Sequence, residues 1–204
     1  MSYRINEMFY SVQGEGVRAG TPNVFVRFSA CNLKCNRAEH GFDCDTEFVS
    51  GLSWTRDELF EKVETLGRGC KNIIWTGGEP LLQLDADLVE KFASAGYHQA
   101  IETNGTVAPK ARVFENLNWV CVSPKTAEHT LVAWSDPVDE IKYVRRVDMG
   151  IPKPIVKARY KLISPAHLSD GSVTSEDLSW CIKLVEDNPE WRLSVQQHKQ
   201  WRVR

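Results

Sequence analysis

Short apolar runs alternate with amphipathic segments along this chain, which predicts an α/β protein. The first run, Val24–Phe28, alternates and is mostly β-branched or aromatic, as is typical of a buried strand. Five further runs have the same character and are predicted to be strands. They are Ile73–Trp75, Ala100–Ile101, Trp119–Val122, Ile141–Val144 and Arg192–Val195.

Three segments show apolar residues at helical spacing behind a capping residue. Thr55 and Glu58 form a capping-box pattern at the start of the first. Asp85 or Asp87 begins the second, and Thr174 begins the third. The predicted apolar faces are Leu59, Val63 and Leu66; Leu88, Val89 and Phe92; and Leu178, Ile182 and Val185.

Helices that separate strands imply a parallel sheet. Residues 123–165 contain no good amphipathic helix, so helices are fewer than strands. The pattern predicts a shortened, incomplete (β/α) barrel of about six parallel strands. No repeat, low-complexity segment or linker interrupts residues 1–204, so we expect one domain.

Composition narrows the functional classes. A hydrophobic content of 42% and a charged content of 25% are ordinary for a globular protein, and the net charge of −2 favours neither nucleic-acid nor membrane binding. The first residues lack the apolar core of a signal peptide, which predicts a cytoplasmic location. The six cysteines are therefore not expected to form a disulfide framework.

Cys31, Cys35 and Cys44 follow the first predicted strand within fourteen residues. Three thiolates suit an iron–sulfur cluster that keeps one iron open. The cysteines alone leave two alternatives open, a zinc site that includes His40 and thiols that bind no metal. The remaining cysteines lie on or beside core elements and are expected to be small buried hydrophobes.

Five turns follow predicted strands or precede the first one, and each alone has an ordinary structural explanation, such as a glycine turn or a solvated rim. Together they occur in the order that one active-site mouth at the strand ends requires. These turns are Gln13–Gly16, the cysteine loop at 31–46, Thr76–Pro80, Glu102–Gly105 and Ser123–Lys125.

A Cys-x-x-x-Cys loop followed by Gly77-Gly78-Glu79-Pro80 resembles the radical S-adenosylmethionine superfamily. The start Gln13–Gly16, the run Cys44–Thr46 and the tail His198-Lys199 are more specific, and resemble the 7-carboxy-7-deazaguanine synthase family of that superfamily. The superfamily's usual spacing is Cys-x-x-x-Cys-x-x-Cys. Eight residues separate Cys35 from Cys44 here, which we interpret as a loop insertion.

The resemblance implies that Cys31, Cys35 and Cys44 hold a [4Fe–4S] cluster whose fourth iron binds S-adenosylmethionine. Thr46 would supply an oxygen to Mg²⁺. The cofactor contacts implied by the resemblance are Gly77, Gly78, Glu79, Ser123, Pro124 and Lys125.

The implied substrate is 6-carboxy-5,6,7,8-tetrahydropterin, whose ring contracts with loss of ammonia to 7-carboxy-7-deazaguanine. Arg27 would bind its carboxylate. The resemblance also implies that Glu102 is a catalytic residue, together with the three cysteines. The other implied substrate contacts are Val12, Gln13, Gly14, Glu15, Thr76, His198 and Arg204. The resemblance also implies an electron donor such as flavodoxin or ferredoxin, and a homodimer.

Two other functions compete with this one. A radical S-adenosylmethionine activase that acts on a protein would need a docking surface and often further cluster cysteines, and neither is evident in the sequence. A non-enzymatic zinc-binding module would use Cys31, Cys35, Cys44 and His40. The colour of an anaerobic preparation distinguishes a cluster from zinc.

Overall fold

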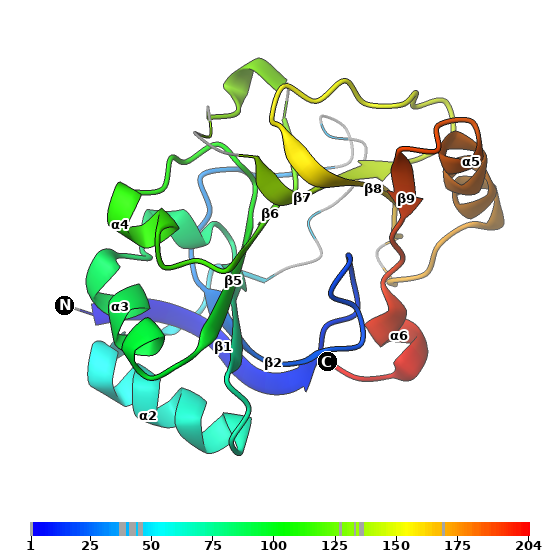
Figure 1. Cartoon of the computed structure of the whole chain (residues 1–204). Coiled ribbons are helices and arrows are strands. Elements are labelled where there is room, and N and C mark those ends of the chain that lie inside the picture. The colour runs from blue at the N-terminus through cyan, green and yellow to red at the C-terminus, as the bar shows by residue number, and fades with distance from the viewer. Residues whose placement is uncertain are drawn as a thin grey trace.

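A curved nine-stranded sheet forms the framework of the protein (Figure 1). The computed structural model describes residues 2–36, 40, 44, 47–126, 128–132, 134, 137–168 and 170–204. The strands are β1 (Ser2–Val12), β2 (Pro22–Phe28), β3 (Leu52–Thr55), β4 (Asn72–Gly77), β5 (His98–Thr103), β6 (Trp119–Val122), β7 (Val138–Arg145), β8 (Ala158–Pro165) and β9 (Trp191–Leu193).

The strands follow the order β3-β1-β2-β4-β5-β6-β7-β8-β9. All pairings from β2 to β9 are parallel, whereas β1 pairs antiparallel with both β2 and β3. The sheet bends into an arc, and within the described residues its order ends at β3 and β9 without closing. The predicted incomplete barrel is confirmed, with seven parallel strands. The strands β1, β3 and β8 were absent from the prediction.

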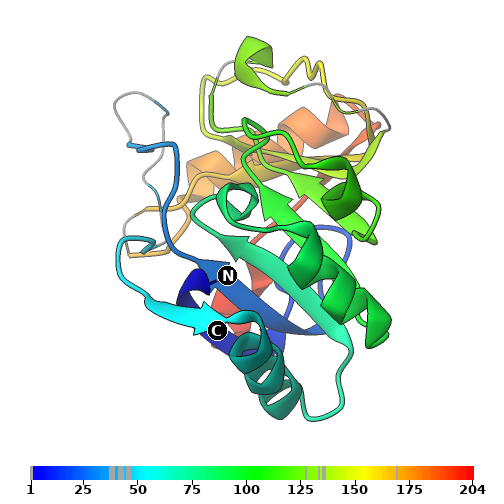
Figure 2. The ribbon, with the colours of Figure 1, turned by 90° about the vertical axis from the view of Figure 1, so that its left-hand side faces the viewer.

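Helices accompany this arc, and most of them lie on its convex face. They are α2 (Arg56–Gly67), α3 (Ala86–Ser94), α4 (Ala111–Phe114), α5 (Ser175–Glu186) and α6 (Gln197–Trp201), with 3₁₀ turns η1 (Pro80–Leu82) and η2 (Glu128–Thr130). Figure 2 shows α2, α3 and α4 (teal to green) in front of the sheet. Among the described residues, the stretch 123–165 contains only η2 and strands, as its lack of apolar periodicity predicts. None of the described helices has the length and apolarity that a membrane crossing requires.

The three predicted caps begin their helices. Thr55 and Glu58 form both hydrogen bonds of a capping box at α2, and Thr174 Oγ1 accepts from Asp177 N at α5. At α3 the capping residue is Asp85, whose side chain accepts from Leu88 N. Each cap satisfies a backbone N–H that the first helical turn leaves unpaired.

The buried face of α5 differs from the prediction. Its buried residues are Asp177, Cys181 and Leu184, while Ile182 is 39% exposed. Asp177 turns inward because its Oδ1 accepts from Val147 N at 2.9 Å, a contact with the segment after β7. By contrast, the predicted faces of α2 and α3 are buried in the main core, apart from the partly buried Leu66.

The concave face of the sheet carries two layers of inward residues. The layer nearer the amino ends of the strands is apolar and forms a cluster separate from the main core. In this layer Phe25 pairs with Ile74, Ile74 with Ala100, and Ala100 with Trp119. Strand residues two positions apart share a face. The next layer is therefore formed by residues two positions further on, and it is polar. Its members are Arg27, Thr76, Glu102 and Cys121.

The β1–β2 loop, residues 13–21, connects this concave face with the C-terminal segment. Gly16 N donates to Ser194 Oγ at 3.0 Å, and Gln197 N donates to Gly14 O at 2.9 Å. Val17 N donates to Glu140 Oε1 on β7. Figure 1 shows this blue loop inside the arc of strands, with α6 (red) beside it. The loop thus joins two parts of the chain that lie at opposite ends of the sequence.

Candidate active site

The cysteine loop leaves the carboxyl end of β2 and is fastened to the end of β4. Gly78 N donates to Phe28 O at 3.1 Å, and Glu79 N donates to Ala30 O at 2.9 Å. Cys31 and Cys35 are partly buried and Cys44 is exposed. The predicted Mg²⁺ ligand Thr46 lies outside the described residues.

The two glycines of Gly77-Gly78 allow this close approach. Gly77 has φ +124°, and a Cβ there would lie 2.2 Å from Phe28 O. A Cβ on Gly78 would lie 2.0 Å from Ala30 O and 3.0 Å from the Cβ of Cys31. Any side chain would therefore force the two segments apart. The glycine pair positions the first cysteine, and its contact with a cofactor stays a prediction.

Glu79 is completely buried and connects the ends of β4 and β5. Its carboxylate accepts from Thr103 Oγ1 at 2.8 Å, from Asn104 N at 2.8 Å and from Leu81 N at 3.0 Å. Burial raises the pKa of Glu79, although these hydrogen bonds favour its ionised form. Its described contacts brace Asn104, whose Nδ2 in turn lies 3.9 Å from Cys31 Sγ.

The sulfur donors fit an iron–sulfur cluster. Cys31 Sγ accepts from Leu33 N at 3.4 Å as well as from Asn104, and such contacts support a thiolate. Burial raises the pKa of the Cys31 and Cys35 thiols, and the charge of Lys125 opposes this at Cys35. Within the described residues, no three His, Cys, Asp or Glu side chains converge on a single metal ion. Cluster cysteines bind different irons and need not converge.

The Ser123–Lys125 turn follows β6 and borders an open cleft of about 560 Å³. Lys125 Nζ donates to Ser123 Oγ at 2.5 Å, and Ser123 Oγ donates to Lys142 O at 3.2 Å. Pro124 and Lys125 line the cleft together with His40 of the cysteine loop. A cleft of this volume is within the range of small-molecule sites. The structure therefore brings the predicted cofactor turn to the cysteine loop.

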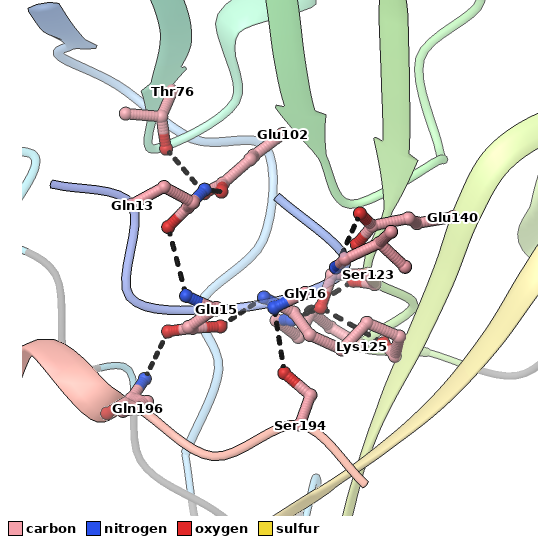
Figure 3. A network of polar contacts seen from close by, with 12 residues as sticks. Gln13, Glu15, Gly16, Thr76, Glu102, Ser123, Lys125, Glu140, Ser194 and Gln196 are labelled. Atoms are coloured by element: carbon pink, nitrogen blue, oxygen red, sulfur yellow. Dashed lines mark hydrogen bonds and ion pairs between the residues drawn. The ribbon is translucent and has the colours of Figure 1, made fainter. Parts of the chain in front are cut away.

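A second group of predicted residues meets on the concave face, as Figure 3 shows. Gln13 Nε2 donates to Glu102 Oε1 at 2.8 Å, and Thr76 Oγ1 donates to Glu102 Oε2 at 3.3 Å. Glu15 N donates to Gln13 Oε1 at 3.2 Å. Residues from β4, β5 and the β1–β2 loop thus form one network, although up to 89 positions separate them in the sequence.

Glu15 is held as a carboxylate. Burial alone would raise its pKa, but the adjacent ammonium of Lys142, with a smaller effect of His198, lowers the pKa of Glu15 to about 2. Lys142 Nζ donates to Glu15 Oε2, and Gln196 Nε2 donates to Oε1 at 2.7 Å. The carboxylate therefore has partners on β7 and on the C-terminal segment.

Sequence reasoning missed Glu140 and Lys142. Both line the same cavity as Gln13, Glu15 and Glu102. Glu140 accepts from Val17 N and from Trp119 Nε1, each at 3.0 Å, and burial raises its pKa. Part of the signal was available: Lys142 is a charged residue inside the predicted strand Ile141–Val144, and Glu140, two positions earlier, shares its face because the strand begins at Val138. Arg18 of the loop lines this cavity as well.

The remaining predicted substrate residues lie around this network. Arg27 is on β2 opposite Thr76, and its Nε lies 2.9 Å from Glu7 Oε1. Val12 ends β1. His198 packs on Gly14, and a Cβ at position 14 would lie 2.3 Å from His198 Nδ1. Arg204 O accepts from Ser11 Oγ at 2.6 Å. The structure thus brings the C-terminal segment to the end of β1 and to the β1–β2 loop.

Known proteins share this fold and sequence. Residues 26–149 match the family model of the radical SAM superfamily. The 7-carboxy-7-deazaguanine synthase of Bacteroides thetaiotaomicron is 36% identical over 98% of this chain and 97% of its own length. The synthase of Burkholderia multivorans is 37% identical over 98% of each chain.

A solved structure agrees at the level of the fold. The crystal structure of QueE from Escherichia coli superposes with a TM-score of 0.73 at 24% identity, over 96% of this chain and 94% of that chain. The coverage leaves no large part of either chain unmatched. From these matches and its cysteine loop, the chain belongs to the radical SAM superfamily and, within it, to the 7-carboxy-7-deazaguanine synthase family.

Proposed function

We propose that this enzyme converts 6-carboxy-5,6,7,8-tetrahydropterin into 7-carboxy-7-deazaguanine with loss of ammonia. One observation carries the proposal: the anionic Glu15 and the Gln13–Glu102 pair line a cavity inside the arc of strands whose ends carry the cysteine loop. A pterin offers an amino group and a ring N–H that such acceptors bind. The relatives of this chain carry the name of that synthase.

The enzyme uses a [4Fe–4S] cluster and S-adenosylmethionine. Cys31, Cys35 and Cys44 would hold the cluster, which supplies an electron that cleaves S-adenosylmethionine to start radical chemistry. Packing of Pro124 and Lys125 around the cleft beside His40 supports their role as cofactor contacts. The further proposed contacts are Gly77, Gly78, Glu79 and Ser123. Thr46 would bind Mg²⁺.

Substrate binding would divide between the two ends of the heterocycle. Arg27 would bind the carboxylate, since a guanidinium forms two parallel bonds to it. Glu15, Gln13 and Glu102 would accept and donate at the amino-pyrimidinone edge. Val12, Gly14, Thr76, His198 and Arg204 would complete the pocket, in accord with the packing of the C-terminal segment on the β1–β2 loop.

The substrate is a small molecule, and the electron must come from elsewhere. We propose a flavodoxin or ferredoxin as the donor, since cluster reduction needs a low-potential carrier. We propose a homodimer, as the resemblance implies, and the cytoplasmic location that the N-terminal sequence predicts. Residues 1–204 would form one radical-SAM domain with its cluster loop at 31–46, which the continuous sheet supports.

An anaerobic assay tests the function. Reconstituted protein is incubated with S-adenosylmethionine, Mg²⁺, a chemical reductant and 6-carboxy-5,6,7,8-tetrahydropterin, and the product is identified by ultraviolet absorbance and mass. We expect 7-carboxy-7-deazaguanine, with S-adenosylmethionine regenerated in each cycle. Reactions that lack the reductant or contain Cys44→Ala are the controls. Cleavage of S-adenosylmethionine without conversion of the pterin would refute the substrate assignment.

A further inference from the structure

An ion pair lies in the cavity where the proposed function places the heterocycle. Lys142 is on β7 and Glu15 on the β1–β2 loop, and their side chains are 10% and 17% exposed. Both line the cavity that also contains Gln13, Glu102 and Glu140.

Fold stability does not explain this lysine. Moving two charges out of water costs several kcal/mol, and apolar residues of similar volume are often as stable as a buried pair. Ile74 on β4 and Ala100 on β5 show that the concave face of the sheet accepts apolar residues. A role in positioning another group is therefore the better explanation for Lys142.

The contacts of Lys142 fix Glu15 in one orientation. Its ammonium donates to Oε2 while Gln196 Nε2 donates to Oε1, so both carboxylate oxygens are anchored. An ionised carboxylate has about four acceptor sites, and these donors occupy two. Among the described contacts of Glu15, this leaves two acceptor sites for a neighbouring pair of N–H donors. The carbonyl of Lys142 also accepts from Ser123 Oγ, which links this carboxylate to the predicted cofactor turn.

We propose that Lys142 is a positioning residue for the substrate: its ammonium orients the Glu15 carboxylate to accept the amino group and ring N–H of a pterin-type heterocycle. This inference rests on the proposed function, since it concerns the same cavity. Lys142 itself need not touch the substrate, because it acts through Glu15.

The charges around Glu15 give this role a dependence on pH. Lys142 faces it from β7 and His198 from α6, and the cavity adds Arg18, Glu102, Glu140 and Cys121. With Lys142 present, the pKa of Glu15 is about 2, so the carboxylate stays ionised at every working pH. Without the ammonium, burial is the largest remaining influence and raises that pKa. Glu15 then takes up a proton as the pH falls and loses its acceptor capacity.

The test is substrate binding to Lys142→Met. Calorimetric titration of the unreduced, cluster-loaded protein with 6-carboxy-5,6,7,8-tetrahydropterin, in the presence of S-adenosylmethionine, measures the dissociation constant without turnover. We expect the ratio of the mutant to the wild-type constant to rise as the pH is lowered, by about tenfold per pH unit below the new pKa. Ionisation of the substrate cancels in this ratio.

Three variants control this experiment. Lys71→Met removes an exposed ion pair with Glu64 and should keep the wild-type profile. Glu15→Gln should bind weakly at every pH, and the double variant Glu15→Gln/Lys142→Met should bind weakly without a new dependence on pH. The double variant also leaves neither member of this ion pair buried without the other, so it keeps the test valid if Lys142→Met alone fails to fold.

The outcomes separate the two proposals. A wild-type protein that binds no pterin refutes the proposed function. Binding by wild type together with an unchanged affinity and pH profile in Lys142→Met overturns the positioning role and leaves the function standing. An effect of Lys142→Met that persists in full on the Glu15→Gln background would also overturn it, because a lysine that acts through Glu15 has no further effect once that carboxylate is gone.

Discussion

Replacement of Gly78 by alanine should displace the cysteine loop. The new Cβ would lie 2.0 Å from Ala30 O, whereas ordinary contact begins near 3.4 Å, so the two backbones must separate by about 1.4 Å. The Cβ of Cys31, 3.0 Å away, must move as well. The contacted atoms belong mainly to the backbone, and no side-chain rotation relieves the clash.

We expect two effects of Gly78→Ala. Overpacking of this kind costs about 1–3 kcal/mol, which lowers the melting temperature by roughly 2–4 °C per kcal/mol in a chain of this size. Movement of Cys31 should reduce cluster assembly more severely, because a ligand displaced by an ångström no longer reaches its iron. The hydrogen bonds from Gly78 N and Glu79 N to the loop should weaken together.

The assay measures iron and sulfide after anaerobic reconstitution, with thermal melting followed by circular dichroism. Gly150→Ala is the matched control, since a Cβ there meets nothing within 4 Å and the residue has no positive φ. It should load a full cluster and melt within about 0.5 kcal/mol of wild type. Full cluster loading and unchanged melting in Gly78→Ala would refute the argument that this glycine positions the loop.

Three further predictions concern the cluster, the magnesium ion and the fold. Cys44→Ala should abolish cluster binding. Cys70→Ala should retain the cluster, because the Cys70 thiol contacts Pro22 O near the opposite ends of the strands. Normal iron content in Cys44→Ala would contradict the ligand assignment. Thr46→Ala should keep the cluster and weaken the response of turnover to Mg²⁺, and an unaltered metal titration would argue against that role. Tyr3→Phe should lower the free energy of unfolding, measured with denaturant, by about 1–2 kcal/mol. The Tyr3 hydroxyl donates at 2.8 Å to Asp85, the cap of α3. Equal stability of the variant would show that this buried hydrogen bond contributes nothing.

Local signals in the sequence were the most reliable. The caps at Thr55, Asp85 and Thr174 depend on atoms three residues apart, so the sequence contains everything that they require. The predicted strands coincide with the centres of β2, β4, β5, β6 and β7 for a similar reason, since their apolar runs are buried on both faces. Apart from β6, which has the predicted bounds, these strands extend further, because pairing with neighbours continues beyond the apolar residues.

Distant contacts explain what the sequence did not reveal. β1 carries Arg4 and Glu7 among its apolar residues and pairs antiparallel at the side of the sheet, so it lacks the continuous apolar run of a central parallel strand. Asp177 is buried through Val147, 30 positions away, and this rotates the face of α5. Lys142 meets Glu15 across 127 positions. No window of local periodicity contains such partners.

The family motifs identified the residues around the cysteine loop more completely than the residues that line the cavity. Gly77, Gly78 and Glu79 could be recognised because they are contiguous, and they do brace the loop that carries Cys31. Lys142 stands between apolar residues in a strand and belongs to no short motif. A charged residue inside a predicted central strand is itself a signal, because burial of a lone ammonium is too costly without a partner.

The sheet itself keeps the two halves of the site in register. On β4, β5 and β6 an inward residue of the cavity layer is followed two positions later, just beyond the end of the strand, by a residue on the proposed cysteine or cofactor side. These pairs are Thr76 and Gly78, Glu102 and Asn104, and Cys121 and Ser123. Two strand residues span about 6.6 Å, so one pleat repeat separates the proposed heterocycle-binding layer from the cluster side on all three strands. A radical reaction requires the reacting atoms to be close, and hydrogen-bonded strands fix that spacing more rigidly than loops could. Under the proposed function, the partial barrel would therefore set the distance between cofactor and substrate through its backbone, while the cysteine loop and the β1–β2 loop would supply the chemistry on either side.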